Sequence, residues 1–262
     1  MPRVPKNGGI KLRYEAANLQ GVGARERQED AFTLVNAIDE QMYYRLGLMF
    51  VVCDGMGGMK DGKLASDTAI SCLRNFFNNM DRCGSIPLQL KNCLENASCE
   101  VKRAIDGEGG STAVVGIILD EQLYFASVGD SFLYLYRNGG LYRLNHHNTV
   151  CHDLYMKNIR SGSTETQSCR EDPEADALSQ FLGVSELSDV DVNVRPLNLH
   201  KGDILLACSD GVGGVLDKSE IIEALGQSAP QSICKTLEEH IIGHSNQNQD
   251  NYTALVIECR TR

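Results

Sequence analysis

Apolar positions in the first fifth of the chain follow the alternation and the short apolar runs that are typical of β-strands. Strands are predicted within residues 12–54, including AFTLVNAI and YYRLGLMFVVC, which a polar turn at Asp39 and Glu40 would join. The second segment ends in an unbroken apolar run, residues 50–53, which predicts a buried strand. Asp54 and a glycine-rich stretch follow this strand directly.

The apolar period then changes to that of helices. One helix is predicted over roughly residues 63–80, and a second begins near Ser85 with Pro87 in its first turn. Each helix gathers its apolar residues on one face, which predicts packing against the core.

Four short apolar segments follow the glycine-rich break at 107–110: STAVVGIIL, LYFASV, FLYLYR and LYRLN. The connections DEQ, GDS and NGG are too short for parallel crossovers, so we predict an antiparallel meander.

Residues 148–187 are polar and less regular, which predicts a mobile segment. Strands return at VDVNVRPL and DILLACSD, helices are predicted over 219–225 and 230–242, and YTALVIEC is the final strand. This order favours antiparallel sheets with helices layered outside them.

Composition narrows the class of protein. The 262 residues, 42% hydrophobic and 23% charged, are typical of a soluble globular protein. No apolar run approaches the roughly 20 residues of a membrane span, and the N-terminal stretch lacks the apolar segment of a signal peptide, so we expect a cytoplasmic protein without membrane partners. Ten cysteines without a C-x-x-C pair indicate reduced thiols, and a net charge of −10 argues against nucleic acid as a partner.

Acidic residues recur where predicted strands begin or end. Asp54, Asp130 and Asp210 end strands, while Asp250 and the pair Glu29 and Asp30 precede strands. One Asp beside Gly is an ordinary turn, but repetition at five positions favours carboxylates that converge on one edge. Converging carboxylates repel one another, and hard cations such as Mg²⁺ or Mn²⁺ relieve that repulsion.

Six motifs stand in one order along nearly the whole chain: RERQEDA, DGMGG, GSTAV, VGDS, SDGV and QDNYTALV. In this order the chain resembles the metal-dependent PPM family, the protein phosphatase 2C-like Ser/Thr phosphatases, in its compact bacterial form. The resemblance implies one α+β domain over residues 1–262, a four-layer α-β-β-α sandwich whose two antiparallel β-sheets are flanked by helix pairs. Residues 1–11 would form a flexible tail, and 148–187 would match the family's flap.

The resemblance also implies a binuclear metal centre that holds Mn²⁺ or Mg²⁺. Asp54 would bridge both cations, and the carbonyl of Gly55 would bind the second. Asp210 and Asp250 would complete the ligands of the first cation. Asp130, with Asp210, would hold a weaker third cation.

The remaining matches concern water and phosphate. Glu29 and Asp30 would support the metals and their waters, and Arg25 would bind the phosphate through a planar, two-pronged contact. The implied reaction is hydrolysis of phosphoserine or phosphothreonine by a metal-bridging water or hydroxide. For Arg25, the alternative is an exposed side chain paired with Glu26.

Some positions depart from the family pattern. Gln28 stands where Asn is usual, Phe132 where Arg is common, and LNHHNT replaces Leu-Thr-x-Asp-His-Ser/Thr. Met56 takes the place of a His proposed as general acid in some eukaryotic members, so the sequence does not identify the group that protonates the leaving oxygen. None of these changes removes a main metal ligand.

Two other functions remain open. A catalytically silent PPM-fold binding module would retain the fold without turnover. A haloacid dehalogenase-type phosphotransferase would need a second Asp two residues after Asp54, where Met56 stands.

Other polar groups favour structural roles. We expect His146, His147 and His152 to be exposed loop residues rather than a further metal site, and Cys53 and Cys208 to be buried core thiols. The partners implied by the resemblance are phosphoprotein substrates and a Ser/Thr kinase that acts on them, and we expect a monomer.

Overall fold

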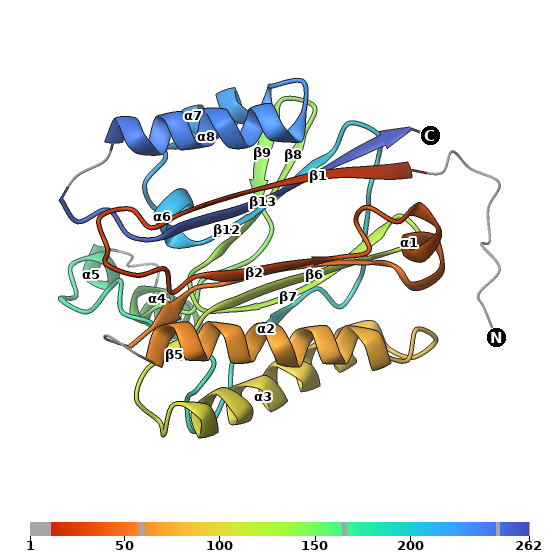
Figure 1. Ribbon diagram of the computed structural model, residues 1–262. Helices are drawn as coiled ribbons and strands as arrows, with labels where there is room; N and C mark the ends of the chain where they lie inside the picture. Colours follow the sequence, from red (N-terminus) through yellow and green to blue (C-terminus); the bar gives the residue numbers. More distant parts are fainter. Residues whose placement is uncertain (1–11, 58–60, 164–166, 245–246, 262) are drawn as a thin grey trace.

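The computed structural model describes residues 12–57, 61–163, 167–244 and 247–261. Two antiparallel sheets face each other (Figure 1). Helices α7 (Lys218–Leu225) and α8 (Pro230–His244) cover one sheet, and α2 (Asp61–Asn79) and α3 (Ile86–Ala104) cover the other. The predicted α+β sandwich is confirmed, whereas the tail predicted for residues 1–11 lies outside the described residues, and the single domain over 1–262 stays a prediction.

The strands pair in a fixed order in each sheet. The first sheet has the order β1 (Leu12–Gly21), β13 (Tyr252–Thr261), β12 (Ile204–Cys208), β8 (Phe132–Arg137) and β9 (Gly140–Arg143). The second has the order β10 (Asp191–Val192), β7 (Gln122–Val128), β6 (Ala113–Leu119), β3 (Leu48–Cys53) and β2 (Ala31–Val35), and β11 (Leu197–Asn198) also pairs with β7. Two short strands, β4 (Gly55–Met56) and β5 (Gly110–Ser111), form a separate pair.

The four central strands do not form the predicted meander. They make two hairpins, β6 with β7 in one sheet and β8 with β9 in the other. The chain crosses between the sheets at residues 129–131, where Gly129 adopts a φ of +96°. Glycine tolerates this left-handed conformation, so a connection as short as a hairpin turn changes sheet.

The predicted polar turn near Asp39 is instead the start of helix α1 (Glu40–Leu46). The Asp39 carboxylate accepts a hydrogen bond from the backbone N–H of Met42, and Gly47 ends the helix with a φ of +85°. These local caps override the β-propensity of Tyr43 and Tyr44.

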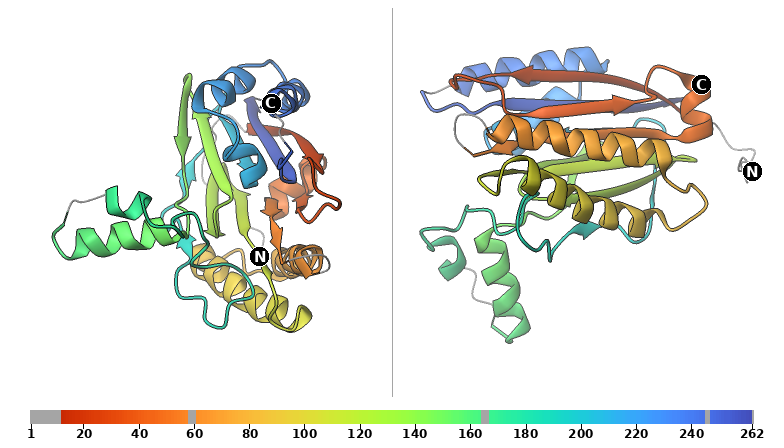
Figure 2. Two further views of the ribbon diagram at one scale, coloured as in Figure 1. Left: turned by 90° about the vertical axis from the view of Figure 1, so that its left-hand side faces the viewer. Right: turned by 60° about the horizontal axis from the view of Figure 1, so that its bottom comes forward.

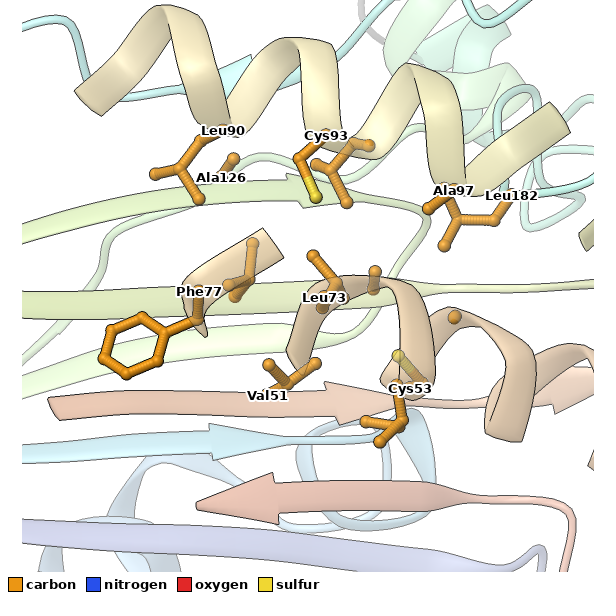
Figure 3. Close-up of a cluster of buried hydrophobic side chains, with 14 of the residues drawn as sticks. Val51, Cys53, Leu73, Phe77, Leu90, Cys93, Ala97, Ala126 and Leu182 are labelled. Atoms are coloured by element: carbon orange, nitrogen blue, oxygen red, sulfur yellow. The ribbon is translucent and has the colours of Figure 1, made fainter. Parts of the chain in front are cut away.

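Strand β3 is buried on both faces, as its unbroken apolar run predicted. Val51 and Cys53 face the core formed with α2 and α3, while Phe50 and Val52 face the core between the sheets. Figure 3 shows Leu73 and Phe77 of α2 beside Val51 in the first core. Cys53 and Cys208 are buried thiols, as expected, and none of the ten cysteines, all of which lie in the described ranges, forms a disulfide.

The segment predicted to be irregular, 148–187, contains helices α4 (Val150–Arg160) and α5 (Gln167–Arg170). The Thr149 hydroxyl accepts from the backbone N–H of His152 and so begins α4. No side chain of α4 is buried, and both helices project from the layers (Figure 2). The assignment of residues 148–187 as a flap, and the mobility of this segment, stay predictions.

The strand predicted at VDVNVRPL is reduced to the two short strands β10 and β11. Between them, the Asn193 side-chain amide accepts from the Phe125 N–H and donates to the Leu123 carbonyl, and only the Asn193 N–H makes a backbone bond, to the Phe125 carbonyl. Pro196 has no N–H to donate, which interrupts the strand further. Across the described ranges, no helix is both long and apolar enough to cross a membrane.

Candidate metal centre

The predicted acidic residues meet at one end of the sandwich. Asp54 follows β3, Asp130 follows β7, Asp250 lies just before β13, and Asp210 is the first residue of the short helix α6 (Asp210–Gly213). All four line one pocket of about 570 Å³, together with Arg25, Glu29 and Gly55. The convergence expected from the strand ends is therefore present.

Asp54 and Asp210 form the centre of the acidic cluster. Their carboxylates are in hydrogen-bond contact, and the pKa of each is raised, chiefly because burial disfavours the charged form. Other carboxylates raise the pKa of Asp54 further, with Asp30 and Asp210 contributing most. The proximity of the two carboxyl groups disfavours their simultaneous ionisation unless a positive charge compensates it.

Asp130 completes the acidic wall of the pocket. Burial, together with the charge of Asp210, raises the pKa of Asp130 to about 6. The turn that carries it is held by Asn148, whose side-chain oxygen accepts from the Gly129 N–H at 2.9 Å. The Asn148 N–H in turn donates to the Gly129 carbonyl at 2.9 Å.

Arg25 stands at the mouth of the pocket in an ion pair with Asp250. Its Nη2 donates to Asp250 Oδ2 at 2.7 Å, and 57% of the arginine side chain is exposed. The alternative pairing of Arg25 with Glu26 is thus not the one observed. A cation facing an acidic cluster from an exposed position can bind an incoming anion.

The loop that carries Arg25 is fixed by a side chain that the sequence analysis assigned no role. Asn251 is buried; its Oδ1 accepts from the Glu29 N–H at 2.6 Å, and its Nδ2 donates to the carbonyls of Val22 and Arg27. The signal was an amide directly after Asp250, at the start of a strand. Asn251 therefore holds the loop that carries Arg25 close to Asp250, the neighbour of Asn251 in the chain.

Only one residue of the predicted acidic pair, Glu29 and Asp30, faces the pocket. Glu29 lines the pocket, whereas Asp30 is fully buried and is not among the lining residues. Asp30 Oδ2 accepts from the Ser209 hydroxyl at 2.8 Å, and burial is the main cause of its raised pKa. Gln28 fits this arrangement, because its side-chain oxygen accepts from the Asp30 N–H.

Two hydroxyl residues position Asp54 from behind. The Asp54 N–H donates to Thr112 Oγ1 at 2.9 Å, and the Thr112 N–H donates to the Asp54 carbonyl at 2.8 Å. Thr112 Oγ1 also bonds the Ser131 hydroxyl at 2.7 Å. Thr112 and Ser131 belong to the motifs GSTAV and VGDS, but the sequence alone does not reveal these roles.

Gly55 lies where no side chain fits. An added Cβ would lie 2.1 Å from the Gly62 carbonyl oxygen and 2.6 Å from that of Glu29. The glycine therefore lets the backbone after Asp54 pass close to the start of α2.

The donor set fits hard divalent cations in chemical type and in charge. The ligating atoms would all be oxygens, Asp210 Oδ1 is buried with no hydrogen-bond partner, and repulsion among the carboxylates is uncompensated. No group of three or more His, Cys, Asp or Glu side chains in the described part of the chain is already arranged to hold a metal ion. Of these carboxylates, Asp250 is paired with the exposed Arg25.

The altered LNHHNT motif still supports the pocket. Asn145 and Asn148 are both buried, and Asn145 bonds the N–H of Leu133 and the carbonyl of Ser131. Phe132, the other departure, stacks on Tyr134. Asn145 and Asn148 therefore keep the turn that carries Asp130 in place.

The expectation of exposed loop histidines is wrong. His146 lies half-buried between Asp189 and Asp191, at 3.4 Å from each, and its ring stacks on His152 of α4. His147 packs edge-on against Phe132, and burial lowers its pKa to about 3.

Residues 17–158, more than half of the chain, match the sequence model of a family described as protein phosphatase 2C. The chain belongs to this family. It is therefore a metal-dependent protein Ser/Thr phosphatase, as the six motifs predicted, and the haloacid dehalogenase alternative is excluded.

Relatives and solved structures agree with this family. The serine/threonine phosphatase stp of Listeria monocytogenes is 28% identical over 217 residues, 79% of this chain and 83% of the relative. The PPM Ser-Thr phosphatase MsPP from Mycobacterium smegmatis superposes with a TM-score of 0.73 at 26% identity, over 93% of this chain and 97% of its own. The catalytic domain of PstP, solved with two manganese ions, shares the fold at 21% identity, with a TM-score of 0.69 over 95% of this chain and 100% of its own.

Proposed function

We propose that the acidic pocket is the catalytic centre at which this phosphatase hydrolyses phosphoserine and phosphothreonine in proteins. The observation that carries the proposal is the meeting of Asp54, Asp130, Asp210 and Asp250 with Arg25 around one pocket of about 570 Å³. Carboxylates from four separate strand ends have no structural reason to converge in this way, since their mutual repulsion is destabilising.

The pocket would hold two divalent cations, Mn²⁺ or Mg²⁺. Asp54 would contact both, with the Gly55 carbonyl beside it, while Asp210 and Asp250 would contact the first. Asp130, which shares the wall with Asp210, would hold a weaker third cation. The two manganese ions of the PstP structure support the number of main sites.

The cations would supply a lowered pKa for a coordinated water and would neutralise charge on the phosphate oxygens. The side chains of the chain perform the remaining tasks. Arg25 exchanges its exposed contact with Asp250 for the substrate phosphate, which it holds by two parallel N–H···O bonds. Glu29 faces the pocket and orients water there.

Asp30 acts from behind the pocket. It accepts from Ser209, the residue that precedes Asp210, and so fixes the backbone from which Asp210 projects. Asp30 is therefore a positioning residue, with no direct contact to the substrate phosphate.

No side-chain nucleophile is needed, and the leaving oxygen is protonated without histidine. The described lining of the pocket contains no His, Cys, Lys or Tyr, and Met56 occupies its edge. Carboxyl groups and solvent are the proton donors that remain.

Substrates are phosphoproteins, and the opposing enzyme is a Ser/Thr kinase with shared targets. The phosphatase acts as a monomer in the cytoplasm, in keeping with ten cysteines that form no disulfide. The intact acidic set argues against a catalytically silent binding module.

The test is hydrolysis of a phosphothreonine peptide by the purified chain. Release of phosphate should require Mn²⁺ or Mg²⁺ and should stop when excess EDTA is added. Full turnover in EDTA would contradict the proposal, and no turnover with either cation would favour the silent binding module.

A further inference from the structure

A second pocket, of about 400 Å³, adjoins the catalytic pocket. Met56 and Gly57 line both pockets, so the two share one wall. The remaining lining residues come from the end of α3, the loop after it and the segment that follows the projecting helices: Lys102, Gly107, Gly109, Phe181, Gly183, Val184 and Ser185.

The shared wall is fixed by a glycine contact. Gly57 and Gly109 both adopt positive φ, +137° and +100°. A Cβ on Gly57 would lie 2.7 Å from the Cα of Gly109, and a Cβ on Gly109 would lie 2.5 Å from the Met56 carbonyl oxygen. Because neither position accepts a side chain, the wall keeps its shape and the second pocket keeps a fixed place beside the first.

The second pocket combines apolar walls with one cation. Met56, Phe181 and Val184 supply the apolar surface. Lys102 lies in the last turn of α3, and its Nζ donates to the Ser185 hydroxyl at 2.9 Å. Within the described ranges no carboxylate pairs with Lys102, whereas the neighbouring Arg103 is paired with Glu100.

We propose that this pocket is a specificity subsite for an acidic residue of the phosphoprotein, near the phosphorylated residue in sequence. Lys102 binds its carboxylate, while Met56 and Phe181 contact its methylene groups. This inference rests on the proposed function of the adjoining pocket.

The charges around the second pocket indicate which kind of residue it binds. The catalytic pocket is lined by carboxylates, and the chain has a net charge of −10, so an acidic residue beside the phosphate meets repulsion over most of this face. Lys102 provides a cation in a pocket that adjoins the catalytic one. An ordinary exposed ion pair contributes up to about 1 kcal/mol, which corresponds to roughly a fivefold preference.

The experiment measures kcat/KM on matched phosphothreonine peptides in Mn²⁺. Glu, Gln or Lys is placed in turn at each of roughly three positions on either side of the phosphothreonine. An extended chain advances about 3.3 Å per residue, so these positions cover the residues that can reach a pocket beside the catalytic one. At one or two positions the wild type should prefer Glu over Gln by about fivefold. Lys102→Gln should abolish this preference, and Lys102→Glu should transfer it to the Lys peptide.

Arg103→Glu is the matched control, because it reverses a charge one residue away on the same helix but outside the pocket. It should keep the preference for Glu. Hydrolysis of p-nitrophenyl phosphate, which has no flanking residue, should be unchanged in both Lys102 variants and shows that they are folded and active.

Equal rates for Glu and Gln at every position in the wild type would overturn the inference, as would a preference for Glu that persists in Lys102→Glu. If aryl phosphate is hydrolysed while the peptide preference is absent, the subsite alone is wrong. If Mn²⁺ supports hydrolysis of neither substrate, the proposed function itself fails.

Discussion

At the scale of single residues, the pocket gathers carboxyl groups in surroundings that disfavour their charged form. Asp54 and Asp210 touch each other, Asp130 has a pKa raised to about 6, and Asp210 Oδ1 is buried without a partner. Their raised pKa values arise from burial and from one another. Their convergence therefore lowers the stability of the metal-free fold, as the proposed cation site would require.

Asp54→Asn should stabilise the metal-free protein while it lowers kcat by at least about 100-fold. An acid whose pKa is raised binds its proton in the folded state at a pH where the unfolded chain does not, so the wild type gains stability as the pH falls through the raised pKa of Asp54. The advantage in Tm of the variant in EDTA should therefore be largest near pH 7.5 and should shrink as the pH falls toward 5. Thermal melts across this range check it; an advantage that grows at low pH would contradict the assigned repulsion.

Arg25→Ala should lower kcat/KM for small phosphomonoesters by about 10- to 100-fold, mainly through KM, because charge-assisted hydrogen bonds to phosphate are lost. Arg25→Lys should recover little, since a single ammonium cannot make the two parallel bonds. Steady-state kinetics measure both, with Arg27→Ala, at the same pocket, as the control expected to change KM less. An unchanged KM in Arg25→Ala would leave Arg25 as a partner of Asp250 only.

At the scale of elements, loops positioned by buried amides bring the strand ends together. Asn251 holds the loop that carries Arg25, and Asn148 holds the turn that carries Asp130. Thr112, at the start of β6, fixes the backbone of Asp54 after β3. The rigid sheets set the distances between the strand ends, and these side chains orient the loops that leave them.

Asn251→Ala should destabilise the protein by about 1–3 kcal/mol, because it leaves the N–H of Glu29 and the carbonyls of Val22 and Arg27 without their partner. It should also raise KM, since Arg25 loses its fixed position. Urea unfolding and kinetics measure the two effects. Asn79→Ala, at the exposed end of α2, is the control and should change neither the free energy of unfolding nor KM. Normal stability of Asn251→Ala would show that Asn251 does not hold the loop that carries Arg25.

At the scale of the whole molecule, the positions that the sequence predicted best are those fixed by short-range patterns. The apolar run before Asp54 predicted both the burial of β3 and the place of its carboxylate, and Ser85 with Pro87 marked the start of α3. The chain's passage between sheets at Gly129 was missed, because a hairpin turn and a change of sheet require equally few residues.

The separation of Glu29 from Asp30 was missed for a related reason. Neighbouring residues at a strand start point to opposite sides, so only one of the pair faces the pocket. Helix α4 was also missed, since none of its side chains is buried and no apolar face pointed to the core.

The central claim is that the four carboxylates form the metal centre. The most direct measurement is the anomalous scattering of Mn²⁺ in crystals of the wild type and of Asp54→Asn, grown at the same Mn²⁺ concentration. The account predicts two strong peaks in the wild type within coordination distance of Asp54, Asp210 and Asp250, and the loss of at least one in the variant. Peaks remote from this pocket in an enzyme that requires Mn²⁺, or an unchanged pair in Asp54→Asn, would contradict it.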